Sequence, residues 1–141
     1  MLNTIIGNEF LKKVLPILKE AKKEIDIIVF DWRWYPDQVG YSIQKFNQEI
    51  IQKAKSGVNI RAILNTKDTE KILKEQGIKT NIRDFGGLLH TKLMIIDDQI
   101  VIIGSHNYTY NAFETNFEAS VIIDDKDIAQ IFKEYFLSFW R

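Results

Sequence analysis

The chain has 141 residues, 45% of them hydrophobic and 27% charged, which is enough for a folded domain with its own core and excludes an intrinsically disordered protein. It contains no cysteine, so disulfide bridges, thiolate metal sites and thiol nucleophiles are excluded, and its two histidines are too few for a multi-histidine metal site in one chain. Basic and acidic residues balance at 19 each, which argues against a uniformly basic nucleic-acid-binding protein.

The charges are unevenly distributed along the chain. Residues 1–83 carry 15 Lys or Arg against 10 Asp or Glu, whereas residues 84–141 carry 4 against 9. Solvated helix faces are the simpler explanation of this asymmetry, and a local basic surface is the alternative. No apolar run approaches the roughly 20 residues that span a bilayer, and no charged leader followed by an apolar core opens the chain. We therefore expect a cytoplasmic protein without integral membrane association.

The first part of the chain alternates helical and strand patterns, after at most a short strand over Asn3–Ile6. In chain order these patterns predict a helix over residues 8–23 that Pro16 kinks or interrupts, a strand over Ile25–Asp31, a helix from Ser42 to about Gly57, a strand over Val58–Leu64, a helix from Asp68 to about Gly77 and a strand over Ile78–Arg83. Such alternation is typical of layered α/β proteins with parallel strand pairs.

After Gly86-Gly87 the pattern changes. Lys92–Asp97 and Ile100–Gly104 read as two strands of a hairpin with a tight turn at Asp98-Gln99, and Phe117–Ile123 reads as a further strand. The last segment has apolar residues at helical spacing, namely Ile128, Phe132, Tyr135, Phe136 and Phe139. We predict one α/β domain over residues 1–141, with a mixed, largely parallel β-sheet flanked by helices.

The most specific feature is the segment HTKLMIIDDQIVIIGSHN, residues 90–107. Its side chains suit chemistry on a phosphate. A neutral imidazole at His90 can attack phosphorus, and strand alternation puts the Lys92 ammonium on the same face, where it can neutralise phosphate oxygens. Ser105 and Asn107 can donate hydrogen bonds to the same oxygens, and Gly104 allows the backbone to approach closely. The segment therefore predicts an active site for phosphoryl transfer.

Three neighbouring residues have less obvious roles. An attacking imidazole needs an acceptor for its second nitrogen, and Glu118 on the following strand can supply one, although an exposed or salt-bridged glutamate fits the same spacing. Asp97 lies five residues after Lys92, on the other strand face and beside the turn, so we expect it to be structural. His106 is expected to have a structural or supporting role.

The pattern H-x-K-x4-D-x6-G-S-x-N, formed by His90, Lys92, Asp97, Gly104, Ser105 and Asn107, resembles the signature of the phospholipase D superfamily. Most of the chain resembles its small, single-motif members, which include Nuc-like bacterial nucleases and mitochondrial nuclease-or-lipase relatives. The resemblance implies catalysis by His90, Lys92 and Asn107 with support from Ser105 and Glu118, the latter beside the histidine, and a framework role for Asp97 and Gly104.

The resemblance also implies a mechanism. Two copies of the motif form one active site, in which one histidine attacks phosphorus, the other protonates the leaving oxygen, and water then releases the phosphohistidine. Because this chain has one motif, the resemblance implies a homodimer with a shared site. No metal or other cofactor is expected, since two lysines and two asparagines would supply the electrostatic stabilisation.

A second candidate region follows the first strong strand, where Trp32, Arg33 and Trp34 alternate aromatic and cationic side chains. By the resemblance this loop lies near the substrate entrance, and its composition suits base stacking and phosphate contact. Two alternatives remain: Trp32 or Trp34 packs beneath the sheet or in a dimer interface, or the aromatics rest at a lipid headgroup surface.

Three functions follow from these patterns. We expect a metal-independent phosphodiesterase, an endonuclease that hydrolyses DNA and/or RNA through a phosphohistidine intermediate. The first alternative is a phospholipase D-type hydrolase or transphosphatidylase acting on phospholipid. The second is a non-catalytic nucleic-acid-binding module, which the intact set of His90, Lys92, Asn107 and Glu118 disfavours. The residues alone do not choose between DNA, RNA and lipid as the substrate.

Overall fold

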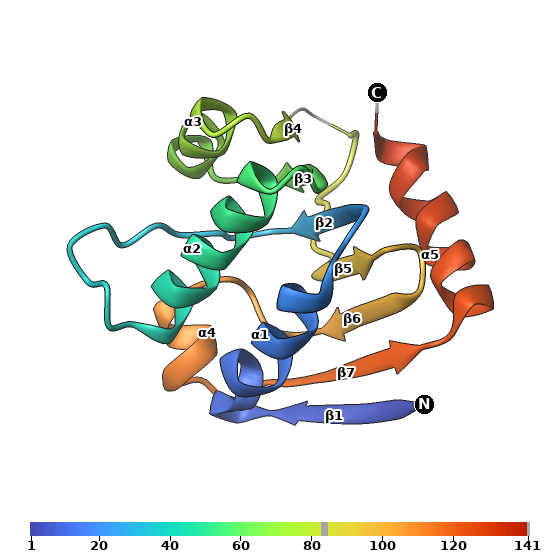
Figure 1. The fold of residues 1–141 in the computed structure, drawn as a ribbon, viewed down its shortest axis with the longest axis horizontal. Helices are drawn as coiled ribbons and strands as arrows, with labels where there is room; N and C mark the ends of the chain where they lie inside the picture. The colour runs from blue at the N-terminus through green and yellow to red at the C-terminus, as the bar shows by residue number, and fades with distance from the viewer. Residues whose placement is uncertain (83–84, 141) are drawn as a thin grey trace.

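A computed structural model of the chain describes residues 1–82 and 85–140, and Figure 1 shows one β-sheet with helices on both of its faces. The strands are β1 (Leu2–Ile6), β2 (Glu24–Val29), β3 (Asn59–Leu64), β4 (Lys79–Asn81), β5 (Leu93–Ile96), β6 (Ile100–Gly104) and β7 (Ala119–Asp124). The helices are the 3-10 turn η1 (Gly7–Glu9), α1 (Phe10–Glu20), α2 (Ser42–Lys55), α3 (Lys67–Glu75), α4 (Tyr110–Glu114) and α5 (Lys126–Phe139).

The strands of this sheet are ordered β1-β7-β6-β5-β2-β3-β4. Parallel pairing joins β2 to β3 and β3 to β4, while the β1–β7, β7–β6, β6–β5 and β5–β2 pairs are antiparallel. The prediction of a mixed α/β sheet flanked by helices is confirmed, but the prediction that the sheet is largely parallel is wrong. A parallel pair needs a long crossover connection, usually a helix, and α2 and α3 provide the two crossovers here; the hairpin after β4 then adds strands in the antiparallel sense.

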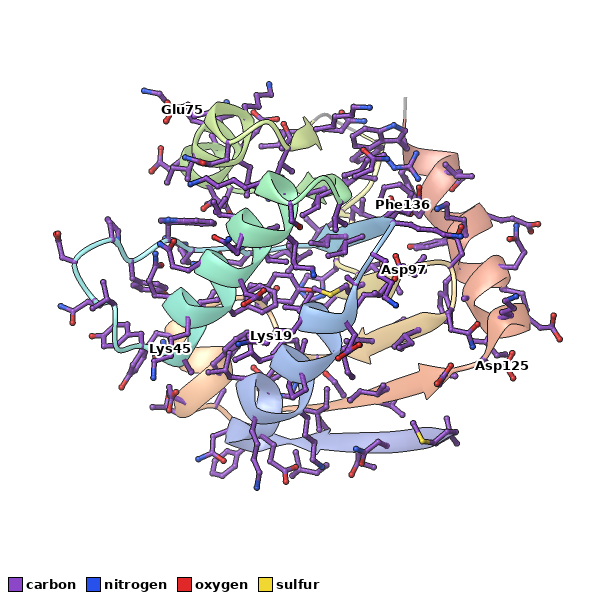
Figure 2. The ribbon with its side chains drawn as sticks, viewed as in Figure 1. Lys19, Lys45, Glu75, Asp97, Asp125 and Phe136 are labelled. Atoms are coloured by element: carbon purple, nitrogen blue, oxygen red, sulfur yellow. The ribbon has the colours of Figure 1, made fainter. Side chains whose placement is uncertain are left out.

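The central strands of the sheet are buried on both faces. Helices α1, α2, α3 and α4 pack on one face around Phe10, Phe46 and Phe113, and α5 packs on the other through Ala129 and Phe136. Figure 2 shows Phe136 on the side of α5 that faces the sheet. Strand β2 illustrates the alternation, because Ile27 and Ile28 belong to opposite cores. Burial on two sides explains why the central strands read as continuous apolar runs in the sequence.

Several local predictions need correction. Helix α1 runs through Pro16 without interruption. The hairpin turn has Asp97 and Asp98 at its centre, both with φ 53°, and Gln99 N donates to Ile96 O at 3.0 Å, which describes a type I′ turn one residue earlier than predicted. Helix α4 was not predicted at all. The expected strand Ile78–Arg83 is β4, and Arg83 lies outside the described residues. Across residues 1–82 and 85–140, every helix is too short or too polar to cross a membrane.

A cluster of charged side chains ties α5 to the sheet at the end where β2 begins. Asp26 is fully buried, and its two carboxylate oxygens lie 2.7 Å from Arg61 Nε and 2.6 Å from Lys133 Nζ. The Lys133 ammonium also pairs with Glu24 and lies 2.8 Å from Asp98 Oδ1. Burial alone lowers the pKa of Lys133, but its hydrogen bonds to Asp26, Asp98 and Glu24 outweigh that effect and raise it. The Lys133 ammonium, together with the Arg61 guanidinium, therefore offsets the repulsion among three carboxylates.

Candidate active site

The predicted site residues meet at one edge of the sheet. Strands β2, β3 and β6 end at this edge, and β5 and β7 begin there, because β5 runs antiparallel to β2 and β6, and β7 runs antiparallel to β6. The edge lies at the left in Figure 1. It collects the segment Phe30–Trp34 after β2, His90–Lys92 before β5, Gly104–Asn107 after β6, and Glu118 before β7.

Gly104 lets β6 and β7 approach each other closely where the site begins. It pairs with Ser120 across the two strands. A Cβ atom on residue 104 would lie 2.5 Å from the carbonyl oxygen of Ala119 and closer still to the Cα and Oγ of Ser120. Because two of these obstacles are backbone atoms, no rotation of a side chain would relieve the overlap. Glycine is thus required here for packing.

His106 is a structural residue of the loop that follows. It is 1% exposed, its Nε2 lies 2.8 Å from the carbonyl oxygen of Gly7, and its Nδ1 lies 2.7 Å from Ser120 Oγ. Since a carbonyl only accepts, Nε2 carries a proton. The ring also contacts Phe10, with centroids 5.0 Å apart. His106 thereby attaches the loop to β7, to the turn after β1 and to the core.

Asn107 is oriented by the backbone of the neighbouring segment. Its Oδ1 accepts a hydrogen bond from Asp31 N at 3.1 Å. The Asp31 carboxylate is in turn held by Arg33 Nε at 2.7 Å and by the Thr66 hydroxyl at 3.3 Å. Because the amide oxygen is occupied, the NH2 group is the part of Asn107 that can donate to a substrate oxygen.

His90 and Lys92 lie in direct contact. Lys92 Nζ is 2.7 Å from His90 Nδ1 and 3.2 Å from Nε2, and the exposed imidazole also packs against Phe30 with ring centroids 4.9 Å apart. An ammonium only donates, so this contact requires a lone pair on the imidazole, as a nucleophile does. Burial lowers the pKa of Lys92, and the negative charge of Glu118 opposes that shift.

Glu118 has different partners from those predicted. Its Oε1 accepts from Ser105 Oγ at 2.6 Å, and its Oε2 accepts from Asn116 Nδ2 at 3.1 Å. Ser105 Oγ accepts in turn from Ala119 N at 3.0 Å. The expected hydrogen bond between Glu118 and His90 does not form between these described residues. Glu118 therefore holds Ser105 and acts electrostatically on Lys92, since both of its carboxylate oxygens are engaged by Ser105 and Asn116.

Asp97 lies at the opposite end of β5 from His90, where Figure 2 labels it. Its carboxylate accepts three backbone hydrogen bonds, from Lys22, Lys23 and Glu24, at 2.7 to 3.0 Å. These contacts fix the hairpin turn to the start of β2. The motif aspartate thus serves the frame of the sheet, as the strand alternation indicated.

The aromatic loop after β2 divides between core and surface. Trp32 is fully buried, with its Nε1 donating to Asn47 Oδ1 at 2.7 Å and its ring against Tyr108 at 5.3 Å, so the prediction that it contacts substrate is corrected. Its apolar ring and single donor are both satisfied in the core. Arg33 is exposed and Trp34 half-buried, and both line an open cavity of about 730 Å³ beside Asn107.

Sequence reasoning missed the residues that form the rest of this cavity. They come from the start of α2 and from the segment after the motif, and they include Tyr41, Tyr110, Asn111 and Asn116. The available signal was the run of tyrosine and asparagine residues directly after Asn107, which has no strand pattern.

The comparison with known proteins agrees with this geometry. A family model described as "Cardiolipin synthase, PLD-like domain" matches residues 14–140. The chain belongs to the phospholipase D-like family.

Individual relatives of this phospholipase D-like chain have several activities in their names. Human mitochondrial cardiolipin hydrolase is 27% identical over 96% of this chain and 52% of its own length, so the chain spans about half of that relative. The virion nicking-joining enzyme of vaccinia virus is 31% identical over 84% of this chain and 31% of its own length. The fold is similar to that of Nuc from Salmonella typhimurium, a phospholipase D family member, with a TM-score of 0.80 and 20% identity over 99% of this chain and 95% of that one.

A first prediction concerns Gly104. Gly104→Ala should lower the free energy of unfolding by about 2–3 kcal/mol, because the new methyl group meets backbone of β7 that cannot move aside. Urea denaturation measures the loss. Gly40→Ala is the matched control, since a Cβ there meets nothing within 4 Å. Equal stabilities of the two variants would contradict the packing requirement.

A second prediction concerns Asp97 and pH. Burial alone would raise the pKa of this carboxyl, but the hydrogen bonds from Glu24, Lys22 and Lys23 outweigh it and lower the pKa. A lowered folded-state pKa stabilises the fold above the unfolded value of about 3.9, and this stabilisation is lost as the pH falls through the folded-state value. Asp97→Asn should therefore cost about 1–2 kcal/mol at pH 7.

Urea denaturation of both proteins from pH 7 to pH 3 checks the pH dependence. The difference between wild type and Asp97→Asn should shrink as the pH falls below about 4. Asp37→Asn, in the exposed loop before α2, is the control and should change stability little at any pH. A difference that stays constant with pH would show that the charge of Asp97 has no such role.

Proposed function

We propose that the protein is a metal-independent phosphodiesterase, an endonuclease that cleaves DNA and/or RNA through a phosphohistidine intermediate. The observation that carries this proposal is the contact between His90 and Lys92 at the sheet edge. There, an imidazole that can offer a lone pair lies beside a lysine that can neutralise the phosphate it attacks. The family membership supports the same chemistry.

The neighbouring residues take defined parts in this proposal. A lone pair of the His90 imidazole forms a bond to phosphorus as the bond to the leaving oxygen breaks. The Lys92 ammonium and the Asn107 NH2 group bind the remaining phosphate oxygens, and Ser105, held by Glu118, supports them. Water then attacks phosphorus and releases the imidazole.

The leaving oxygen needs a proton, and the second histidine of the chain is badly placed to supply it. His106 is buried and both its ring nitrogens are engaged, by Gly7 and by Ser120. The chain has two histidines in all. We therefore infer a homodimer in which His90 of a second copy, required there as the imidazolium, protonates the leaving oxygen and, once neutral, takes a proton from the attacking water.

Phospholipid is the second candidate substrate. The matching family model and the human relative both have cardiolipin in their names, and the same phosphoryl chemistry applies to a lipid diester. Nucleic acid as the substrate is supported by the similarity to the vaccinia nicking-joining enzyme and by the polar, aromatic cavity beside Asn107. A non-catalytic nucleic-acid-binding module is the remaining alternative.

A third prediction tests the chemistry. The protein should cleave single-stranded DNA, duplex DNA or RNA in the presence of EDTA, and His90→Ala should reduce the rate at least about 1000-fold because the nucleophile is lost. Parallel incubation with cardiolipin vesicles separates the lipid alternative, and binding of oligonucleotide without cleavage of any substrate would favour the non-catalytic module. A strict requirement for a divalent metal would refute the mechanism.

A fourth prediction tests the shared site. When wild type and His90→Ala are unfolded together and refolded in varying ratio, activity should follow the square of the wild-type fraction, because only a dimer with two intact histidines is active. Gel filtration confirms the dimer. Activity that is proportional to the wild-type fraction, or full activity in a monomer, would contradict a site that needs both copies.

A further inference from the structure

A cavity lies beside Asn107 and is lined by side chains from several segments of the chain. It has a volume of about 730 Å³ and is bordered by the loop after β2, the start of α2 and the region of α4. The lining combines tyrosine and tryptophan rings with side-chain amides, among them Trp34, Tyr41, Asn111 and Asn116. Pockets of this kind hold a ring against apolar faces and orient it with a few polar groups.

The aromatic side of the cavity is held in place before any ligand binds. Tyr41 packs against Tyr110 with ring centroids 4.4 Å apart and against Tyr35 at 5.6 Å. The hydroxyl of Tyr35 accepts a hydrogen bond from Tyr110 N at 2.9 Å, which connects the loop after β2 to α4. Rings that are already fixed lose little conformational entropy when a planar group stacks on them.

The charges of the cavity fit a neutral ligand. Arg33 and Asp31 are its charged lining residues, and they form an ion pair of 2.7 Å with each other. The hydrogen bond and charge of Asp31 raise the pKa of Arg33, so the guanidinium stays charged and its charge is directed at the Asp31 side chain. A second phosphate, as in a diphosphatidyl lipid, would find no surplus cation among these lining residues. A planar ring with donors and acceptors on its edge matches the amides.

The cavity is joined to the catalytic residues by hydrogen bonds. Asn107 belongs to both, since it lines the cavity and carries the NH2 group expected to bind phosphate. Asn116 lines the cavity and donates to Glu118, which holds Ser105. A group seated in the cavity therefore adjoins whatever phosphate occupies the catalytic residues.

We propose that this cavity binds the nucleobase of the nucleotide next to the scissile phosphate, stacking it on the fixed aromatic side chains and contacting its edge through Asn111. This deepens the proposed function and rests on nucleic acid as its substrate. The arrangement makes the protein selective for a nucleotide that carries a base, while the tyrosine faces accept any of the four bases.

The test uses short single-stranded DNA in which one phosphodiester is cleavable and the other linkages are methylphosphonates. In one series the nucleotide on either side of that diester carries its base, and in the other it is abasic. Removing the base on one side should lower kcat/KM of the wild type about 10-fold to 100-fold, the range for one stacked base. Equal rates for the basic and abasic substrates would overturn the proposal.

Variants then locate the effect in the cavity. Asn111→Ala and Trp34→Ala should lose most of the preference for the base-bearing substrate over the abasic one. Asn111 is exposed on α4, so its variant has the smaller risk of misfolding. Val39→Ala is the matched control, because Val39 lies in the same loop as Trp34, is 74% exposed and does not line the cavity. It should keep the wild-type preference.

Different results would refute the base-binding cavity and the nuclease function. If the DNA is cleaved but Asn111→Ala and Trp34→Ala both keep the full preference, the base lies elsewhere and the nuclease function stands. If no substrate of the series and no RNA equivalent is cleaved while cardiolipin vesicles are hydrolysed, both the nucleic-acid function and this cavity assignment are refuted.

Discussion

The antiparallel pairing of β5 with both β2 and β6 is the constraint on which the site depends. It brings the start of one strand beside the ends of two others, so that Phe30, His90 and Asn107 meet at one edge although they are far apart in sequence. In an all-parallel sheet, the segment before β5 would lie at the opposite edge from the segments after β2 and β6. Strand direction therefore decides whether His90, the proposed nucleophile, and Asn107, its proposed phosphate-binding partner, can meet.

The part of the edge around Asn107 is attached to buried groups. Asn107 is held through Asp31, and the loop around it through His106, whose ring lies between Ser120, Gly7 and Phe10. At the opposite end of β2 a buried ion cluster attaches α5 to the sheet. Strand β2 and the loop around Asn107 are thus held by contacts at both ends of the sheet. Electrostatic catalysis requires such preorganisation.

The features of the fold and the site that the sequence predicts are those whose pattern lies within a short segment of the chain. Strands with both faces buried are local apolar patterns, and the sequence predicts them. The motif that contains His90, Lys92 and Asn107 is also a local pattern, and its role in binding phosphate stays a prediction. Strand direction does not follow from a local pattern. The alternation of strands and helices before β4 predicts parallel pairs, and the sequence of the β5–β6 hairpin does not indicate which strand it pairs with. Trp32 and Trp34 look alike in sequence, yet Trp32 forms a bridge with Tyr108 and is buried, whereas Trp34 is half-buried. Glu118 was placed near the site correctly, but its partner Ser105 depends on side-chain geometry that spacing does not encode.

The burial of His106 bears on how many copies of the chain the proposed reaction needs. Two histidines in one chain would suffice for an attacking base and a proton donor if both faced the substrate. His106 instead uses both ring nitrogens to hold the loop, and exposing it would cost the contacts that position Asn107. The chain therefore cannot expose its second histidine without losing contacts that hold the loop around Asn107. Under the proposed mechanism, this is the reason why the proton for the leaving oxygen is assigned to His90 of a second copy.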